Sequence, residues 1–93
     1  MRTIEFTGQF KRDYKRESKG AHKKTLAKDL SDALNLLRAG KKLPKKYYDH
    51  PLVGDWKDHR DCHIKPDLVL IYRQPDKTTL QLVRLGSHSQ LGI

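Results

Sequence analysis

The 93-residue sequence contains a single cysteine, Cys62, and its longest apolar run is LVLIY at residues 68–72. One cysteine excludes an internal disulfide, and so short an apolar run cannot cross a bilayer. No signal peptide is recognisable at the N-terminus, so we expect a cytoplasmic protein. The sequence also lacks repeats and low-complexity tracts, and its length predicts one domain over residues 1–93.

Acidic residues are too few to balance the basic ones, and the formal net charge is +9. Residues 11–46 contain 13 Lys or Arg against 4 Asp or Glu, whereas the rest of the chain contains 7 of each. The whole positive excess therefore lies in one segment. Such a field favours a polyanionic partner, either nucleic acid, an acidic protein or an anionic membrane surface. The alternative is an ordinary solvated helix surface.

The first half of the sequence predicts one short strand and two helices. TIEF at residues 3–6 alternates like a strand, and Thr7 then provides a helix N-cap. We expect this helix to end near Gly20. A second helix is expected from about His22 to Ala39, because its leucines recur at a spacing close to 3.6 residues.

The second half predicts strands at residues 56–64, 68–73 and 78–85, after a loop at residues 41–53. Short connections between these strands favour an antiparallel meander. The predicted order is β-α-α-β-β-β, and the fold class is α+β. Its two N-terminal helices pack on one face of an antiparallel β-sheet, and the other face stays open.

The meander has a consequence for polar residues that are distant in sequence. His63 lies near the end of its first strand, Asp67 at the start of the second, and His88 just beyond the third. All three are therefore expected at the same edge of the sheet. Alternation places Asp61 beside His63 on the open face. Cys62 then points toward the helices, as a small buried residue rather than a nucleophile.

Other candidate residues are less well placed by spacing. His50 enters through a loop, and no spacing argument fixes its position. His22 and His59 are interpreted as surface histidines. Trp56 is expected in the core, on the same strand face as Cys62, rather than as a platform for base stacking.

Two chemistries use such a set of residues. One is a metal site, for which the permissible ligands are Asp61, His63, Asp67 and His88, although their spacing matches no well-defined ligand pattern. The other is metal-free RNA cleavage, in which histidines act as base and acid for attack of the 2′-OH on phosphorus. An arginine must then stabilise the phosphorane charge, and Arg60 and Arg84 lie on flanking strands. These residues alone leave both chemistries open.

The motifs resemble a known family. The segments are DHPLVGDWKDHRDCHIKPDLVLIYR at residues 49–73 and RLGSHSQL at residues 84–91. They are similar to the YafQ branch of the RelE superfamily, whose members are ribosome-dependent mRNA endonucleases and the toxins of type II toxin–antitoxin pairs. The resemblance covers most of the chain. It implies a microbial RNase fold, with two helices on an antiparallel sheet.

The resemblance also implies roles for individual residues. The active site it implies consists of His50, His63, Asp67 and His88. His88 is expected to be the general acid, His50 or His63 the base, Asp67 an aid to proton transfer or orientation, and Arg84 a neighbour of the scissile phosphate. Binding to 16S ribosomal RNA in the A site of the 70S ribosome is assigned to the basic helices and to Lys41, Lys42, Lys45 and Lys46.

The implied partners are the ribosome with its mRNA and a cognate antitoxin protein, with no membrane and no cofactor or metal. One position departs from the family pattern. Family members often carry an aromatic residue four positions after the tail histidine, and this chain has Gly92 there, between Leu91 and Ile93. Two other functions fit the residues: a non-enzymatic basic module that binds RNA or the ribosome, and a metal-dependent nuclease.

Overall fold

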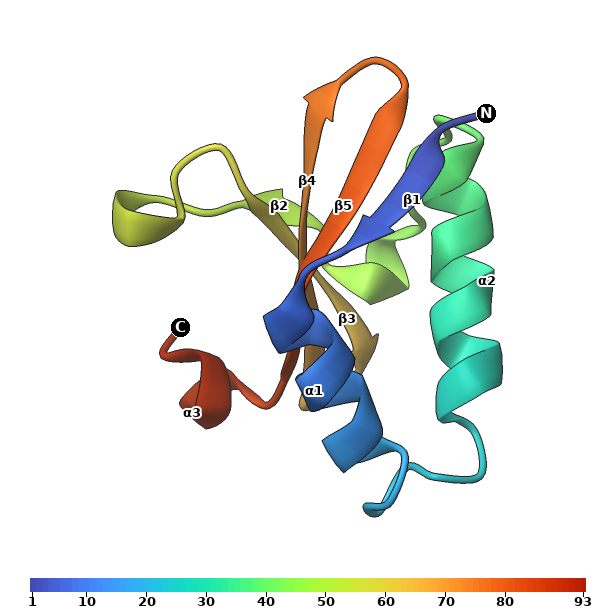
Figure 1. The fold of residues 1–93 in the computed structure, drawn as a ribbon, viewed down its shortest axis with the longest axis vertical. Helices are drawn as coiled ribbons and strands as arrows, with labels where there is room; N and C mark the ends of the chain where they lie inside the picture. The colour runs from blue at the N-terminus through green and yellow to red at the C-terminus, as the bar shows by residue number, and fades with distance from the viewer.

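The computed structural model describes residues 1–93 as a five-stranded sheet with two long helices and three short helical turns (Figure 1). We denote 3-10 helices by η. The elements in chain order are β1 (Thr3–Phe6), α1 (Gly8–Glu17), α2 (Leu26–Arg38), η1 (Lys45–Tyr47), β2 (His50–Pro51), η2 (Gly54–Trp56), β3 (Arg60–Lys65), β4 (Leu68–Asp76), β5 (Thr79–Gly86) and α3 (His88–Leu91).

The strand order in the sheet is β1-β5-β4-β3-β2. β3, β4 and β5 form the predicted antiparallel meander, while β1 pairs in parallel with β5, with Thr3 opposite Thr79. β4 is therefore central, and its apolar residues from Leu68 to Tyr72 are all buried. A strand covered on both faces needs such a continuous apolar run. The predicted α+β class is confirmed.

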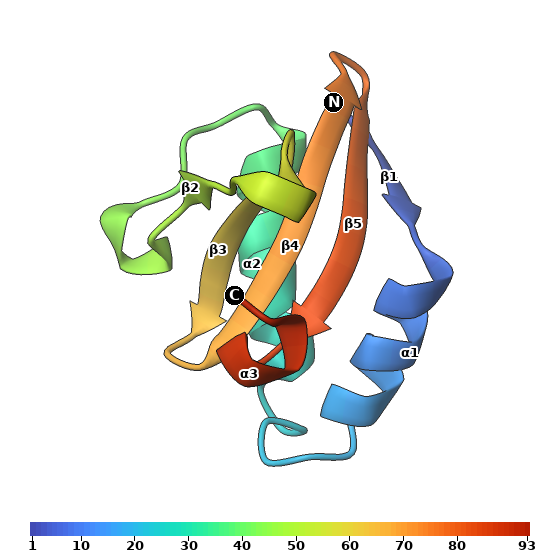
Figure 2. The same ribbon diagram turned by 90° about the vertical axis from the view of Figure 1, so that its left-hand side faces the viewer.

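The two long helices bury apolar stripes against the sheet. Thr7 caps α1, because its hydroxyl oxygen accepts a hydrogen bond from the Phe10 backbone N–H and its O–H donates to the Val83 carbonyl. α2 crosses one face of the sheet, and α1 lies alongside β5 (Figure 2). α2 begins at Leu26 rather than at the predicted His22. The intervening residues form turns, since they offer no apolar side chain to bury before Leu26.

The opposite face of the sheet is partly covered, although we expected it to be open. Val69, Ile71 and Leu91 form a second buried cluster, on which Trp56 and other side chains pack. The prediction that Trp56 shares the face of Cys62 is wrong. Residues 54–56 form η2 instead of a strand, and Asp58 has a φ of 69°, which interrupts the extended chain. β3 therefore starts only at Arg60.

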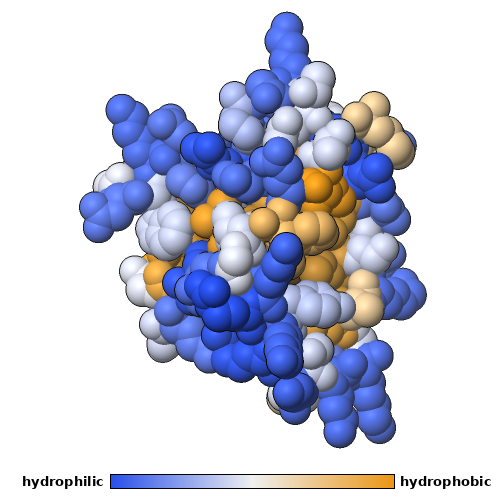
Figure 3. All heavy atoms as spheres, viewed as in Figure 1, coloured by the Kyte–Doolittle hydropathy of each residue, from blue (hydrophilic) through white to orange (hydrophobic).

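On the face shown in Figure 3, hydrophilic side chains surround an apolar hollow between α1 and α2. This hollow has a volume of about 530 Å³. Its apolar lining consists mainly of Ile4, Phe6, Phe10, Tyr14, Leu30 and Leu34. The helices themselves are short or polar, and none has the length and apolar character needed to span a membrane.

Candidate active site

The structure brings His63, Asp67 and His88 together at one edge of the sheet. His63 lies on β3, Asp67 in the turn to β4, and His88 at the start of α3. The His63 and His88 rings meet edge to face, with centroids 5.0 Å apart. Asp67 Oδ1 lies 2.8 Å from His88 Nδ1 and 3.3 Å from the His88 backbone nitrogen. The three residues thus form one contiguous group.

His50 joins this face through the short strand β2, which sequence spacing could not place. In the sheet register His50 lies opposite Asp61, and Asp61 lies opposite Ile71. His50 Nδ1 is hydrogen-bonded to the Tyr48 carbonyl at 2.9 Å and lies 3.0 Å from Asp61 Oδ1. Because a carbonyl can only accept, Nδ1 carries the proton. The neutral imidazole then has its free lone pair on Nε2.

Asp61 lies beneath the histidines and is only 2% exposed. Burial raises the pKa of its carboxyl, while the charges of His50, His63 and His88 act in the opposite direction. Its Oδ1 accepts no aligned hydrogen bond, since the contact with His50 is close but not directed along a donor bond. Asp61 is therefore a buried carboxyl group, next to three imidazole rings, whose Oδ1 lacks a hydrogen bond.

Cys62 points to the other face, as predicted, and is fully buried among the core residues. Burial raises the pKa of its thiol far above the ordinary value. The thiolate that a nucleophilic cysteine needs is therefore inaccessible near neutral pH.

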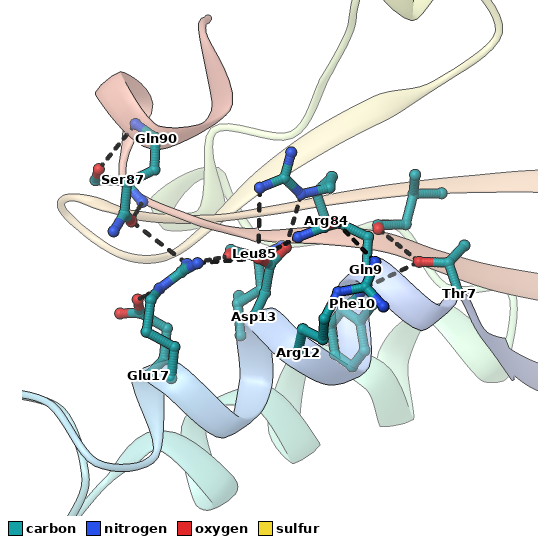
Figure 4. Close-up of polar contacts among 12 residues, drawn as sticks. Thr7, Gln9, Phe10, Arg12, Asp13, Glu17, Arg84, Leu85, Ser87 and Gln90 are labelled. Atoms are coloured by element: carbon teal, nitrogen blue, oxygen red, sulfur yellow. Dashed lines mark hydrogen bonds and ion pairs between the residues drawn. The ribbon is translucent and has the colours of Figure 1, made fainter.

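Arg84 on β5 lies opposite Ile71 on β4. It therefore belongs to the same cross-strand row as Asp61 and His50. Its Nε donates to Oδ2 of Asp13 on α1 at 2.7 Å, and its Nη2 donates to Oδ1 at 3.4 Å (Figure 4). Nη1 makes no hydrogen bond to Asp13 and points away from it (Figure 4). Arg84 is therefore held from one side, with Nη1 free for another acceptor.

Asp13 connects α1 to the strand that leads to the histidine site. It is fully buried and also accepts hydrogen bonds from the Leu85 backbone N–H, Gln9 and Arg16. Burial by itself raises the pKa of Asp13, but the hydrogen bonds from Arg84, Leu85 and Gln9 outweigh it, and the pKa is lowered. The residue is thus an ionised carboxylate in the interior.

Arg16 extends this network to the tail. It donates to the Leu85 carbonyl at 2.9 Å and contacts Gln90 on α3. Gly86 allows this close approach, since a Cβ at this position would lie 2.9 Å from Gln90 Oε1 and 3.0 Å from Arg16 Nη2. α3, which carries His88, is therefore fixed against both α1 and β5.

Among the histidines, Asp67 and the two arginines predicted for the site, only Arg60 is not brought to the same face. It alternates with Asp61 along β3 and so points to the helix-covered face. There its Nε and Nη2 donate to the two carboxylate oxygens of Asp49, at 3.3 and 3.2 Å, and Tyr72 also donates to Asp49. Its guanidinium is committed to this ion pair, which anchors the loop before β2.

The predicted RNA-binding lysines lie in and before η1, and Lys41 lines a hollow with Arg60 rather than the histidine cleft. The side chains of Lys41, Lys42, Lys45 and Lys46 are all exposed. Lys46 lines the same cleft as His63, while Lys42 and Lys45 line a neighbouring hollow with Tyr48.

Gly92 occupies the position at which family members often carry an aromatic residue. It ends α3 with a φ of 71°. Glycine suits this left-handed C-cap better than an aromatic residue does.

A family model described as a bacterial toxin of type II toxin–antitoxin systems, YafQ, matches residues 2–92. The chain belongs to the YafQ toxin family. This confirms the family that the sequence motifs indicated.

Relatives of the YafQ family cover nearly the whole chain. The mRNA interferase toxin YafQ of Escherichia coli K12 is 40% identical over 98% of this chain and 96% of its own length. The crystal structure of the E. coli DinJ–YafQ complex has a TM-score of 0.83, with 37% identity, and 98% of each chain is covered. A metal-bound toxin from Helicobacter pylori has a TM-score of 0.83 at 44% identity, covering 98% of this chain and 99% of its own.

The metal-bound relative raises the question whether this YafQ-family chain has a metal site. The structure contains no group of three or more His, Cys, Asp or Glu side chains arranged to hold a metal ion. His88 Nδ1 is already engaged by Asp67, and His50 Nδ1 by the Tyr48 carbonyl. Each of these two rings therefore keeps only Nε2 for another partner.

The sequence did not identify three residues of this site as functional candidates. Asp61 was considered only as a metal ligand, although its alternation with Cys62 did place it beside His63. Asp13 gave no signal, since its partners on β5, Arg84 and Leu85, lie 71 and 72 residues away. Tyr48 gave none either, because only the fold brings its ring to His63, with centroids 5.4 Å apart.

Proposed function

We propose that this YafQ homologue is a ribosome-dependent mRNA endonuclease that cleaves RNA without a metal ion, by attack of the 2′-OH on the adjacent phosphate. The observation that carries the proposal is the group of His63 and His88 with Asp67 bonded to His88. Two imidazoles on one face can supply a proton acceptor and a proton donor. The E. coli relative named an mRNA interferase supports the same class of reaction.

The proton transfers can be assigned from the tautomers. His50 carries a proton on Nδ1, so its Nε2 can accept the proton of the 2′-OH. His63 is the second candidate for this role, because it contacts His88 directly. The 2′-oxygen then attacks phosphorus, and the bond from phosphorus to the 5′-oxygen breaks. The products are a 2′,3′-cyclic phosphate and a 5′-hydroxyl.

His88 is assigned as the general acid for the departing 5′-oxygen. Asp67 accepts from Nδ1 of the protonated ring and thereby directs the Nε2–H outward. This hydrogen bond from His88 is the main reason why the pKa of Asp67 is lowered. Arg84 can meet the negative charge of the phosphorane through its free Nη1, while Asp13 holds the rest of the guanidinium.

The proposed partners follow from charge and from the relatives. The basic segment at residues 11–46 suits ribosomal RNA, and its exposed Lys46 lines the cleft that contains His63. An antitoxin protein is the second proposed partner, because the E. coli relative has been crystallised in the DinJ–YafQ complex.

The experiment uses purified protein with programmed ribosomes, and cleavage ends are mapped on the bound mRNA. We expect 5′-hydroxyl and cyclic phosphate ends, and no cleavage when a single 2′-deoxy nucleotide replaces the one 5′ of the scissile phosphate. The rate should follow a bell-shaped pH profile. His50→Ala should remove the acidic limb of this profile, because a general base must lose its proton to act. His88→Ala should remove the alkaline limb, because a general acid must keep its proton.

A metal-dependent nuclease remains the second candidate, because a relative from H. pylori is a metal-bound toxin. Chelation must be tested on an RNA that needs no magnesium, since ribosomes require this ion themselves. Loss of cleavage with a chelator and recovery with added metal would favour this candidate. Continued cleavage of the 2′-deoxy substrate would contradict our proposal as well.

A further inference from the structure

Tyr48 has an unusual backbone for a bulky residue. It ends η1 with φ 48° and ψ 41°, the left-handed conformation that favours glycine. Its neighbours on both sides are fixed, because Tyr47 is buried and Asp49 is bonded to Arg60 and Tyr72. The fold therefore imposes this conformation and keeps it against its steric cost. Residues held in this way cluster at functional sites.

The backbone turn directs the Tyr48 ring toward solvent next to the histidines. The residue is 68% exposed, whereas the neighbouring Tyr47 is only 6% exposed. Its ring lies with its centroid 5.4 Å from that of His63, and its carbonyl accepts the hydrogen bond from His50. Tyr48 thus contacts two of the three histidines and leaves most of its surface free.

A cleft of about 650 Å³ begins at this ring and includes Tyr48, His63 and Lys46 in its lining. Two carboxylates also line it, but each is paired with a lysine: Asp29 with Lys65 and Asp32 with Lys28. Lys46 is exposed and in no such ion pair, and its Nζ lies 5.2 Å from the centroid of the buried Tyr47 ring. The cleft therefore offers the exposed Tyr48 ring and one cation without a carboxylate partner beside His63.

We propose that this cleft is a nucleotide subsite, in which Tyr48 stacks on the base that adjoins the scissile phosphate and Lys46 binds a flanking phosphate. An aromatic face accepts any base, and a neighbouring ammonium group adds a backbone contact. The subsite rests on the proposed endonuclease function and sets which nucleotide lies over His63. Tyr48 is accordingly a residue that determines cleavage position and rate.

The test compares wild type with Tyr48→Phe, Tyr48→Gly and Tyr48→Asn on ribosome-bound mRNA. Glycine and asparagine both tolerate the left-handed backbone, so they remove the ring while the carbonyl can stay in place. Asp58→Gly is the matched control, because Asp58 is the other non-glycine residue with positive φ and does not line the cleft. Single-turnover rates and mapped cleavage positions are measured for all variants.

Loss of one base stack lowers binding by roughly 5- to 150-fold. We expect the Gly and Asn variants to lose cleavage by a factor in this range and to change their preferred positions. Tyr48→Phe and Asp58→Gly should cleave like wild type. Equal rates and positions in all variants would overturn the subsite. A shifted pH profile with unchanged positions would also overturn it, since Tyr48 would then act only by holding His50.

A fluorescence measurement separates this inference from the proposed function. An uncleavable 2′-deoxy mRNA carries 2-aminopurine next to the scissile phosphate, and stacking on Tyr48 quenches its emission. Wild type and Tyr48→Phe should quench more than the Gly and Asn variants. If wild type cleaves no RNA, the proposed function falls, and this quenching difference alone decides whether the subsite exists. Equal quenching by all variants would refute the subsite in either case.

Discussion

Asp13 and Arg84 are 71 residues apart in sequence, yet the Arg84 guanidinium donates two hydrogen bonds to the buried Asp13 carboxylate. Helix α1 therefore does more than cover a sheet edge. It supplies the counter-charge that fixes the candidate phosphate-binding arginine, and through Arg16 it also contacts the tail that carries His88. Stability and the candidate site depend on the same carboxylate.

We expect Asp13→Asn to lower the free energy of unfolding by about 1.5–3 kcal/mol, the contribution of hydrogen bonds to charged groups. The folded-state pKa of Asp13 is lowered, so its stabilisation is complete above the unfolded pKa of about 3.9. It is lost as the pH falls through the lower folded pKa. The difference between wild type and variant should therefore be constant near neutrality and shrink below about pH 4.

Urea unfolding followed by circular dichroism at several pH values measures this difference. Asp32→Asn is the control, since its ion pair with Lys28 is exposed and contributes little to stability. A difference for Asp13→Asn that stays constant down to pH 3 would show that the fold does not lower the pKa of this carboxyl. RNA cleavage should also decrease under conditions in which the variant remains fully folded, because Arg84 loses its fixed orientation.

The lysines around η1 should determine ribosome affinity more than the histidines do. Replacing Lys41, Lys42, Lys45 and Lys46 with Gln should weaken binding and flatten its salt dependence, with each lost phosphate contact removing about 0.7–0.9 from the logarithmic slope. Binding is measured by ultracentrifugation over a range of salt concentrations. Lys57→Gln with Lys77→Gln tests loss of charge elsewhere. An unchanged slope for the fourfold variant would exclude phosphate contacts by this loop.

Much of this architecture was predictable because it follows from local periodicity. The alternation in β3 and the apolar run of β4 fix a meander, and a meander necessarily brings His63, Asp67 and His88 to one edge. The start of β3 was not predictable, because the pattern of residues 56–59 still alternates while Asp58 adopts a positive φ. Tertiary contacts determine where β3 starts, because Trp56 packs on the second apolar cluster instead of continuing the strand.

The residues that support the site were out of reach for a related reason. His50 is placed by two residues of β2, too few to produce any periodic signal. Asp13 sits on a helix whose pattern marks it as one polar residue among many, and its partners come from β5. Arg60 illustrates the reverse case. Its position on a flanking strand suggested a catalytic arginine, but the alternation that buries Cys62 also turns Arg60 toward the helix-covered face.

His88 should contribute more to cleavage than Asp67, which acts through it. His88→Ala should lower the single-turnover rate by about 10²–10⁴-fold, the usual effect of one proton-transfer group. Asp67→Asn should lower the rate by less, because the imidazole remains and loses only its orienting partner. His22→Ala is the control, since this histidine lies in the turn between α1 and α2. A folded His88→Ala variant with full activity would remove His88 from the mechanism.

Asp13→Asn is expected to lower both stability and cleavage, whereas Asp61→Asn should raise stability at pH 7 and lower cleavage. Burial raises its folded-state pKa, so its contribution to stability is most favourable below the unfolded pKa of about 3.9. The contribution declines as the pH rises through the folded pKa, and near neutrality the ionised carboxylate destabilises the fold. Asp61→Asn should therefore raise the melting temperature at pH 7, and this gain should vanish near pH 4.

The same substitution should reduce cleavage, because the negative charge beneath His50, His63 and His88 is lost. Thermal unfolding and single-turnover cleavage are measured on the same preparations from pH 4 to 8. Asp55→Asn is a suitable control, since Asp55 is exposed on η2 and should change neither quantity. A less stable Asp61→Asn variant at pH 7 would show that the ion pair with His50 outweighs desolvation of the carboxylate. A more stable variant with full activity would show that the carboxylate serves neither the fold nor the histidines.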